Sequence, residues 1–141
     1  MQLKFKKIHP NAKIPSYAYA GDAGLDLYIP EDLLFKKDER RSIALGIAIE
    51  IPEGYVGILF DKSGLSHKHG LKSYGGIIDS GYRGEIHVGM MNLSDKDYEF
   101  KAGDKIIQIL IMPVLKAEVV ECEELSESDR GEGAFGSSGN K

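Results

Sequence analysis

One glycine-flanked segment, from Gly75 to Glu85, combines an acid and an aromatic residue in a way that could do chemistry. Its two adjacent glycines allow a planar ligand to approach the backbone closely and to hydrogen-bond to it. Asp79 has the chemistry of a general base acting on water, and Tyr82 that of a ring packing on a sugar or base. The alternative is a β-turn in which Asp79 only accepts backbone hydrogen bonds. Residue types alone leave both interpretations open.

A second glycine-rich segment, from Ala20 to Leu27, places Asp22 and Asp26 at the entry to a strand. Carboxylate oxygens are hard ligands that suit Mg²⁺, which keeps several waters and takes only one or two carboxylates beside substrate phosphates. Two acids at this spacing are also common in ordinary loops. The segment is therefore a candidate metal site on residue type alone.

Three further motifs indicate less than they first suggest. Gly131 to Gly136 matches the GxGxxG dinucleotide fingerprint, but the helix and later acidic residue that the fingerprint needs do not follow it. The run Asp61-Lys62-Ser63 lacks the glycine that precedes the lysine of a phosphate-binding P-loop. His67 and His69 have no further Cys or His at zinc-ligand spacing, so we expect solvent-exposed histidines.

The elements that must position these residues show a period of two. From Ser42 to Ile51 every odd residue is a large aliphatic, which predicts a strand. Pro52-Glu53-Gly54 predicts a turn, and the apolar run Tyr55 to Phe60 then predicts a hairpin with the first strand. Only Ser63 to Gly70 favours a helical turn, with Ser63 as its cap. Further predicted strands are Leu3 to Ile8, Leu25 to Ile29, Glu85 to Leu93, Lys105 to Val114 and Ala117 to Cys122. The fold class is all-β, a sandwich or jelly roll.

Composition excludes several classes of protein. A chain of 141 residues with one cysteine has no internal disulfide, so we expect a cytoplasmic protein and read Cys122 as a packed strand residue. Its net charge of −4 argues against nonspecific nucleic-acid or membrane partners. No apolar run approaches the roughly 20 residues that span a bilayer.

The division expected is a β domain over residues 1–126 and an arm over residues 127–141. The arm carries Arg130 and Phe135 among glycines and serines. Such a segment is either a solvating tail or a flap that closes over a base and a phosphate.

Taken in order, five segments resemble the five motifs of the trimeric dUTP pyrophosphatase (dUTPase) family. They are Ala20 to Tyr28, Lys62 to Gly70, Gly75 to Asn92, Gly103 to Gln108 and Arg130 to Gly139. The resemblance covers nearly the whole chain. It implies a jelly-roll-like subunit with a C-terminal arm that closes over active sites shared within a homotrimer. It also implies Mg²⁺-assisted hydrolysis of dUTP to dUMP and pyrophosphate, which limits uracil in DNA and supplies dUMP.

The resemblance also implies roles for single residues. Asp79 orients and deprotonates the water that attacks the α-phosphorus, and Asp26 helps hold Mg²⁺ through its waters. Main-chain groups read uracil, Tyr82 lies under the deoxyribose, and Phe135 covers the base. The expected substrate contacts are Lys62, Ser63, Gly64, Ser73, Gly76, Ile77, Ile78, Tyr82, His87, Gln108, Arg130, Phe135, Gly136 and Ser137. Departures from the family pattern are Asp61-Lys62 for Pro-Arg, Ser73 for asparagine and Ala134 for glycine.

Two alternatives stay open at this point. The related dCTP deaminases share the fold and part of the third motif, but they are typically longer chains, and the segment from Arg130 to Gly139 resembles the arm of a dUTPase. A catalytically silent nucleotide-binding or regulatory trimer is the alternative from another class, and the Asp61-Lys62 departure is what favours it.

Overall fold

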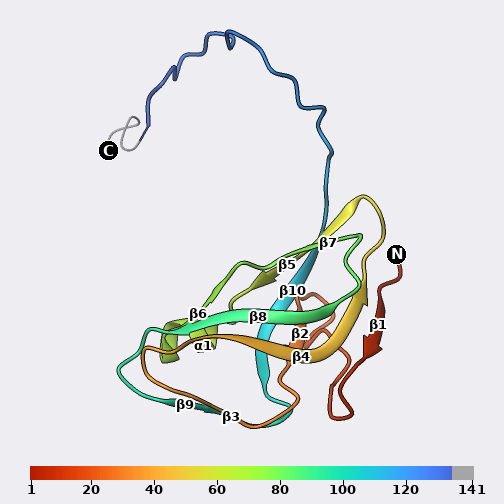
Figure 1. Cartoon of the computed structure of the whole chain (residues 1–141), viewed down its shortest axis with the longest axis vertical. Coiled ribbons are helices and arrows are strands. Elements are labelled where there is room, and N and C mark those ends of the chain that lie inside the picture. The colour runs from red at the N-terminus through yellow and green to blue at the C-terminus, as the bar shows by residue number, and fades with distance from the viewer. Residues whose placement is uncertain (135–141) are drawn as a thin grey trace.

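The computed structural model describes residues 1–134, which form two four-stranded sheets and a short two-stranded one (Figure 1). The strand orders are β1-β4-β8-β6, β2-β10-β5-β7 and β3-β9, and every paired neighbour is antiparallel. This confirms an all-β, jelly-roll-like fold. The bounds are β1 Lys4–Lys7, β2 Leu25–Tyr28, β3 Leu33–Phe35, β4 Arg40–Glu50, β5 Tyr55–Phe60, α1 Ser63–His69, β6 Leu71–Tyr74, β7 Ile77–Asp79, β8 Glu85–Asn92, β9 Tyr98–Phe100 and β10 Lys105–Pro113.

The long strand β4 follows the predicted period of two. Its aliphatic residues Ile43, Leu45, Ile47 and Ile49 are all buried in the core between the sheets. The pairing of β4 with β8 is interrupted between Ala44 and Ala48. Gly46 lies inside this irregularity with φ +68°, a conformation that favours glycine.

The predicted hairpin between β4 and β5 is wrong, because the two strands belong to different sheets. β4 lies between β1 and β8, while β5 lies between β10 and β7, so neither has a free edge for the other. The turn after Pro52 is real, since the N–H of Tyr55 donates to the Pro52 carbonyl at 3.3 Å. It carries the chain from one sheet to the other instead of folding one strand onto the next.

The predicted strand Ala117 to Cys122 is also wrong. After β10 the chain runs away from the sheets without regular structure as far as Ala134 (Figure 1). Cys122 is exposed, not packed, and the side chains of Val119 and Val120 are 94% and 73% exposed. A strand needs a partner for its backbone groups, and within residues 1–134 this segment has none. The strands β3, β6, β7 and β9, each three or four residues long, were not predicted.

The predicted helical turn forms α1, with two differences from expectation. Lys62 instead of Ser63 is the N-cap residue, and no side chain caps the helix. The helix ends at Gly70 with φ +64°, where the left-handed conformation that glycine tolerates stops it. His67 and His69 are not buried, which agrees with the prediction of histidines open to solvent. Across residues 1–134 no helix is long and apolar enough to span a membrane.

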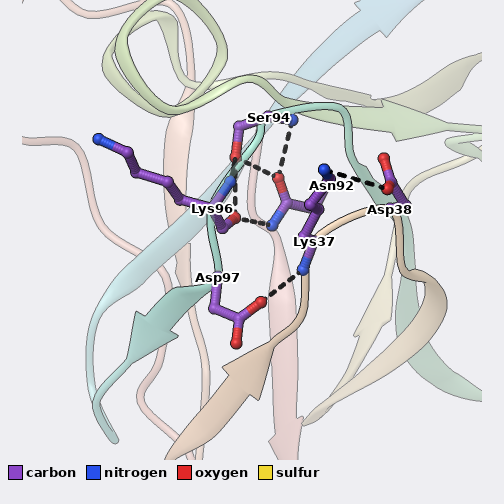
Figure 2. Close-up of polar contacts among 6 residues, drawn as sticks. All are labelled: Lys37, Asp38, Asn92, Ser94, Lys96 and Asp97. Carbon is purple, nitrogen blue, oxygen red and sulfur yellow. Dashed lines mark hydrogen bonds and ion pairs between the residues drawn. The ribbon is translucent and has the colours of Figure 1, made fainter.

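Asn92 at the end of β8 is a buried polar residue with a structural role (Figure 2). Its Nδ2 donates to the carbonyl of Lys96 at 2.8 Å and to that of Phe35 at 3.2 Å. Its Oδ1 accepts from the N–H and the hydroxyl of Ser94. Because every polar group of the side chain has a partner, Asn92 fixes the turn between β8 and β9 at little cost in desolvation.

Candidate active site

The larger candidate site is a cavity of about 700 Å³ over the ends of β2, β5 and β10, called here the charged cavity. The register of the second sheet places Asp26, Gln108 and Phe60 side by side on these three strands. The walls add two further acids, Asp22 and Asp61, and two lysines, Lys62 and Lys105. The lining residues are Ala18, Tyr19, Asp22, Ala23, Gly24, Asp26, Phe60, Asp61, Lys62, Lys105, Gln108 and Leu110.

Asp26 is the charged centre of this cavity, and its side chain is only 5% exposed. One carboxylate oxygen lies 2.6 Å from Lys105 Nζ, and the other pairs with Lys62 Nζ. Burial opposes ionisation, but hydrogen bonds and charge from Lys105 and Lys62 outweigh it and hold the pKa of Asp26 below its ordinary value. The hydrogen bond to Asp26 correspondingly raises the pKa of Lys105. The carboxylate therefore stays ionised between two cations.

Lys105 is a site residue that the sequence analysis missed. In a regular strand, Lys105 and Gln108 would face opposite sides of the sheet, because side chains alternate. A register shift between Lys105 and Ile107 lets both Ile106 and Ile107 turn into the core. The extra residue returns Lys105 to the same face as Gln108. The adjacent isoleucines were the available signal, since two neighbouring core residues break the period of two.

Gln108 is held in one orientation. Its Nε2 donates to the main-chain carbonyl of Asp61 at 3.0 Å, which leaves Oε1 facing Gly24. A β-carbon built on Gly24 would lie 2.7 Å from that oxygen, closer than real side chains approach. A side chain at position 24 would therefore displace the Gln108 amide from this orientation.

Asp61 connects the charged cavity to β6. Its carboxylate accepts from the main-chain N–H of Ser73 at 2.8 Å and from the Ser73 hydroxyl, and it pairs with Lys72. Burial opposes ionisation of Asp61, but the hydrogen bonds from Lys72 and Ser73 outweigh it and lower its pKa. Two of the departures from the family pattern, Asp61 and Ser73, are thus in direct contact.

The smaller candidate site is a cavity of about 180 Å³ between β7 and the start of β8, called here the small cavity. Asp79 is the last residue of β7, and its side chain is exposed. The N–H of Tyr82 donates to the Asp79 carbonyl at 3.0 Å, and the Tyr82 hydroxyl donates to the Glu85 carbonyl at 2.8 Å. These bonds fix the turn and the ring. The lining residues are Ile77, Ile78, Asp79, Tyr82, Glu85, Ile86 and His87.

The adjacent glycines before β7 have the backbone that the sequence suggested. Gly75 and Gly76 have φ of +72° and +111°, which side chains rarely adopt. The carbonyl of Gly76 accepts from the N–H of Leu59 at 2.8 Å, and a β-carbon on Gly76 would lie 3.1 Å from that of Leu59. Gly76 therefore lets β7 start close against β5, and its carbonyl is hydrogen-bonded to that strand.

The two cavities share no lining residue, and Asp79 and Gln108 lie beside opposite ends of β5. Asp79 pairs with Val56, whereas Gln108 pairs with Phe60, four residues further along. At about 3.3 Å per residue the two positions are about 13 Å apart along the strand. The chain thus brings Asp26, Lys62 and Gln108 together at one end, and the residues around Asp79 together at the other.

The remaining predicted residues are spread over the molecule. Ser63 and Gly64 are exposed at the start of α1, next to Lys62, while Ser73 lines neither cavity. Arg130 is exposed beyond the sheets, and its Nε donates to the Gly133 carbonyl at 2.9 Å. Phe135, Gly136 and Ser137 lie outside the described residues.

The side chains of residues 1–134 provide only part of a coordination shell for a metal ion. Within residues 1–134 no group of three or more His, Cys, Asp or Glu side chains is arranged to hold one. The charged cavity offers the carboxylates of Asp22 and Asp26. This donor set fits Mg²⁺, which is commonly held by one or two carboxylates, waters and substrate phosphates, and does not fit a fully protein-bound ion.

Comparisons with known proteins agree with this geometry. A model of the dUTPase family matches residues 10–139. A deoxyuridine 5'-triphosphate nucleotidohydrolase of Nautilia profundicola is 45% identical, over 99% of each chain, and one of a Hydrogenobaculum species is 46% identical, over the whole of both. A mutant dUTPase of Staphylococcus bacteriophage 80alpha with dUpNHpp superposes with a TM-score of 0.93 at 31% identity, over 98% of each chain. A mutant dUTPase of phage phi11, described as coordinating a structural Mg(II) ion, has a TM-score of 0.84 at 27% identity, over 90% of this chain and 100% of its own.

Proposed function

The chain belongs to the dUTPase family, and we propose that it hydrolyses dUTP to dUMP and pyrophosphate, with the triphosphate in the charged cavity and the nucleoside in the small one. The observation that carries the assignment is the group Lys62, Asp26 and Lys105, which concentrates two cations in a chain of net charge −4. The same lining holds the carboxylates of Asp22, Asp26 and Asp61, so the two lysines together with a bound Mg²⁺ ion would offset the charge of a triphosphate. The single cysteine suits a reducing compartment, and we propose the cytoplasm.

The charged cavity supplies the groups for the phosphates. Lys62 and Lys105 turn from Asp26 toward phosphate oxygens, while Ser63, Gly64 and the Gln108 amide contact the phosphate chain. Asp26 would hold Mg²⁺ through water molecules, a role that suits a single ionised carboxylate. When bound, Mg²⁺ offsets charge on the phosphates and on the pyrophosphate that leaves. In the free chain the carboxylate of Asp26 is already ionised, because hydrogen bonds and charge from Lys105 and Lys62 outweigh the effect of burial and hold its pKa below its ordinary value.

Asp79 provides the base. Its exposed carboxylate at the end of β7 can take a proton from a water as that water attacks the α-phosphorus. A new bond then forms between the water oxygen and the α-phosphorus, and the bond to the bridging oxygen breaks to release pyrophosphate. The Tyr82 N–H bonds to the main-chain carbonyl of Asp79, which holds the backbone of this residue beside the small cavity.

The small cavity suits the nucleoside. Main-chain groups of Gly76, Ile77 and Ile78 and of the strand near His87 are proposed to read uracil. The Tyr82 ring lies under the deoxyribose and leaves no room for a 2′-hydroxyl. The hydrogen bond from its hydroxyl to Glu85 supports this role, since it locks the ring.

The active site is proposed to form between subunits of a homotrimer. Within one chain Asp79 and Gln108 lie about 13 Å apart along β5, and a neighbouring chain is proposed to supply the charged cavity that faces Asp79. The segment after β10 supports association, because Leu115, Val119, Val120 and Leu125 are 73–98% exposed. Exposed apolar side chains that lie close together in the sequence are typical of a surface that contacts another chain. The arm, with Arg130, Phe135, Gly136 and Ser137, would then close over a shared site.

The test is pyrophosphate release from dUTP, dCTP, dTTP and UTP in parallel, each with Mg²⁺ and with excess chelator. Release from dUTP alone, lost with chelator, supports the proposal. Ammonia release from dCTP would assign the chain to the deaminases instead. No release from any nucleotide, with binding retained, would favour the silent nucleotide-binding trimer.

A further inference from the structure

Asp61 occupies a position where the family pattern has proline, and its environment is built around its charge. It lies between the end of β5 and the start of α1, directly before Lys62. Its side chain is 15% exposed. Three donors reach its carboxylate: the N–H and hydroxyl of Ser73, and the ammonium of Lys72. Proline could make none of these contacts.

The main chain of the same residue faces the charged cavity. The Asp61 carbonyl accepts from Gln108 Nε2 at 3.0 Å and so sets which end of the amide faces Gly24. A single residue thus joins β6, through its side chain, to the Gln108 amide on β10, through its backbone.

We propose that Asp61 is a positioning residue that holds Lys62 and the Gln108 amide in place for the triphosphate. Anchoring to β6 prevents the short connection between β5 and α1 from moving, and both phosphate-contacting groups depend on that connection. Hydrogen-bond donors that are already held in the binding geometry lose less conformational freedom when a charged ligand binds. This inference rests on the proposed function.

Substitution of Asp61 should weaken binding of the phosphates and not binding of the uracil. Asp61 lines the charged cavity, whereas neither Asp61 nor Ser73 lines the small cavity. Because both donors of Ser73 are engaged by Asp61, the inference assigns Ser73 to this contact in place of the uracil contact expected from the resemblance.

The experiment compares the affinities of α,β-imido-dUTP and dUMP by calorimetry in the presence of Mg²⁺. Asp61→Ala should weaken binding of the triphosphate analogue about tenfold, the effect of losing hydrogen bonds to a charged group, and leave dUMP binding unchanged. Asp61→Asn keeps an oxygen for both Ser73 donors and should restore most of the affinity. If Asp61→Ala does not fold, Ser73→Ala, which removes one donor, should show a smaller change with the same selectivity.

Asp32→Ala is the matched control. Asp32 also accepts from a main-chain N–H, that of Ala102 at 2.8 Å, and pairs with a lysine, Lys101 at 3.2 Å, but it lies outside both cavities. Its removal should leave both affinities unchanged. Equal loss for both ligands in Asp61→Ala, or no loss, would overturn the inference. Failure of the unaltered chain to hydrolyse dUTP would instead overturn the proposed function.

Discussion

Asp79 and Gln108 both lie beside β5 but at opposite ends of it, because Asp79 pairs with Val56 while Gln108 lies across from Phe60. Asp79 is proposed as the base and Gln108 as a phosphate contact, so the two must meet on one nucleotide. A rigid sheet keeps them about 13 Å apart along the strand within a chain. Association of chains is the direct way to bring them together.

Mixing two inactive variants tests this arrangement. Asp79→Asn lacks the base and Gln108→Ala lacks the phosphate contact, so each alone should have little activity. When the two are unfolded together in equal amounts and refolded, roughly a quarter of the shared sites should combine an intact Asp79 with an intact Gln108. Pyrophosphate release should recover to about that fraction of the parental rate. Mixed assemblies without recovered activity would place both residues in a site within one chain.

Asp79→Asn by itself should separate binding from turnover. The amide cannot accept the proton of the attacking water, so kcat should fall by about 10² to 10⁴. The affinity for α,β-imido-dUTP should remain close to that of the unaltered chain, because an asparagine side chain has nearly the same shape as that of aspartate. Steady-state kinetics and calorimetry measure the two quantities. Parental turnover in this variant would remove Asp79 from the role of base.

Removal of residues 130–141 should reduce catalysis and leave the β domain intact. Arg130 lies beyond the last strand, and its side-chain contact in the structure is to Gly133 within the same segment. The melting temperature should therefore change little, while kcat/KM for dUTP should fall sharply. Arg130→Ala in the full chain is the matched variant, and it should lose a part of the same activity. An unchanged kcat/KM after truncation would identify the segment as a solvating tail.

Asp26→Asn should lower stability in a way that depends on pH. The folded state lowers the pKa of Asp26 below its ordinary value of 3.8, so its ionised form stabilises the fold above that pH. At pH 7 the variant should be about 1–3 kcal/mol less stable, since two lysines lose their acceptor. As the pH falls below about 4, Asp26 takes up a proton more readily in the unfolded chain than in the folded one, so the difference should shrink and be lost once the pH is below the lowered pKa of the folded state.

Denaturant unfolding at pH 7 and pH 3, at one protein concentration, measures this difference. Asp22→Asn is the control, because Asp22 lines the same cavity but pairs with neither of the two lysines that hold Asp26. A stability difference that stays constant down to pH 3 would contradict the role of the Asp26 charge.

Local patterns in the sequence predicted most of the framework. The period of two in β4, the apolar run of β5 and the helical turn of α1 were each visible because side-chain alternation is a property of neighbouring residues. The short strands β6 and β7 were missed, since three or four residues carry too little periodicity. The segment Ala117 to Cys122 has the composition of a strand, but it has no partner for its backbone within residues 1–134.

The sequence by itself determined the all-β class, the residue types of the site and, through five ordered motifs, the family. Only the tertiary structure decided which of those residues meet. The predicted hairpin of β4 and β5 was wrong because pairing depends on which strand edges are free. The order of apolar and polar residues along the chain does not show which edges those are. A bulge in β10 brings Lys105 beside Asp26, and the carboxylate of Asp61 accepts a hydrogen bond from Ser73. Asp79 lies at the far end of β5 from Gln108. Each outcome depends on register between distant strands, which long-range packing fixes and local spacing does not.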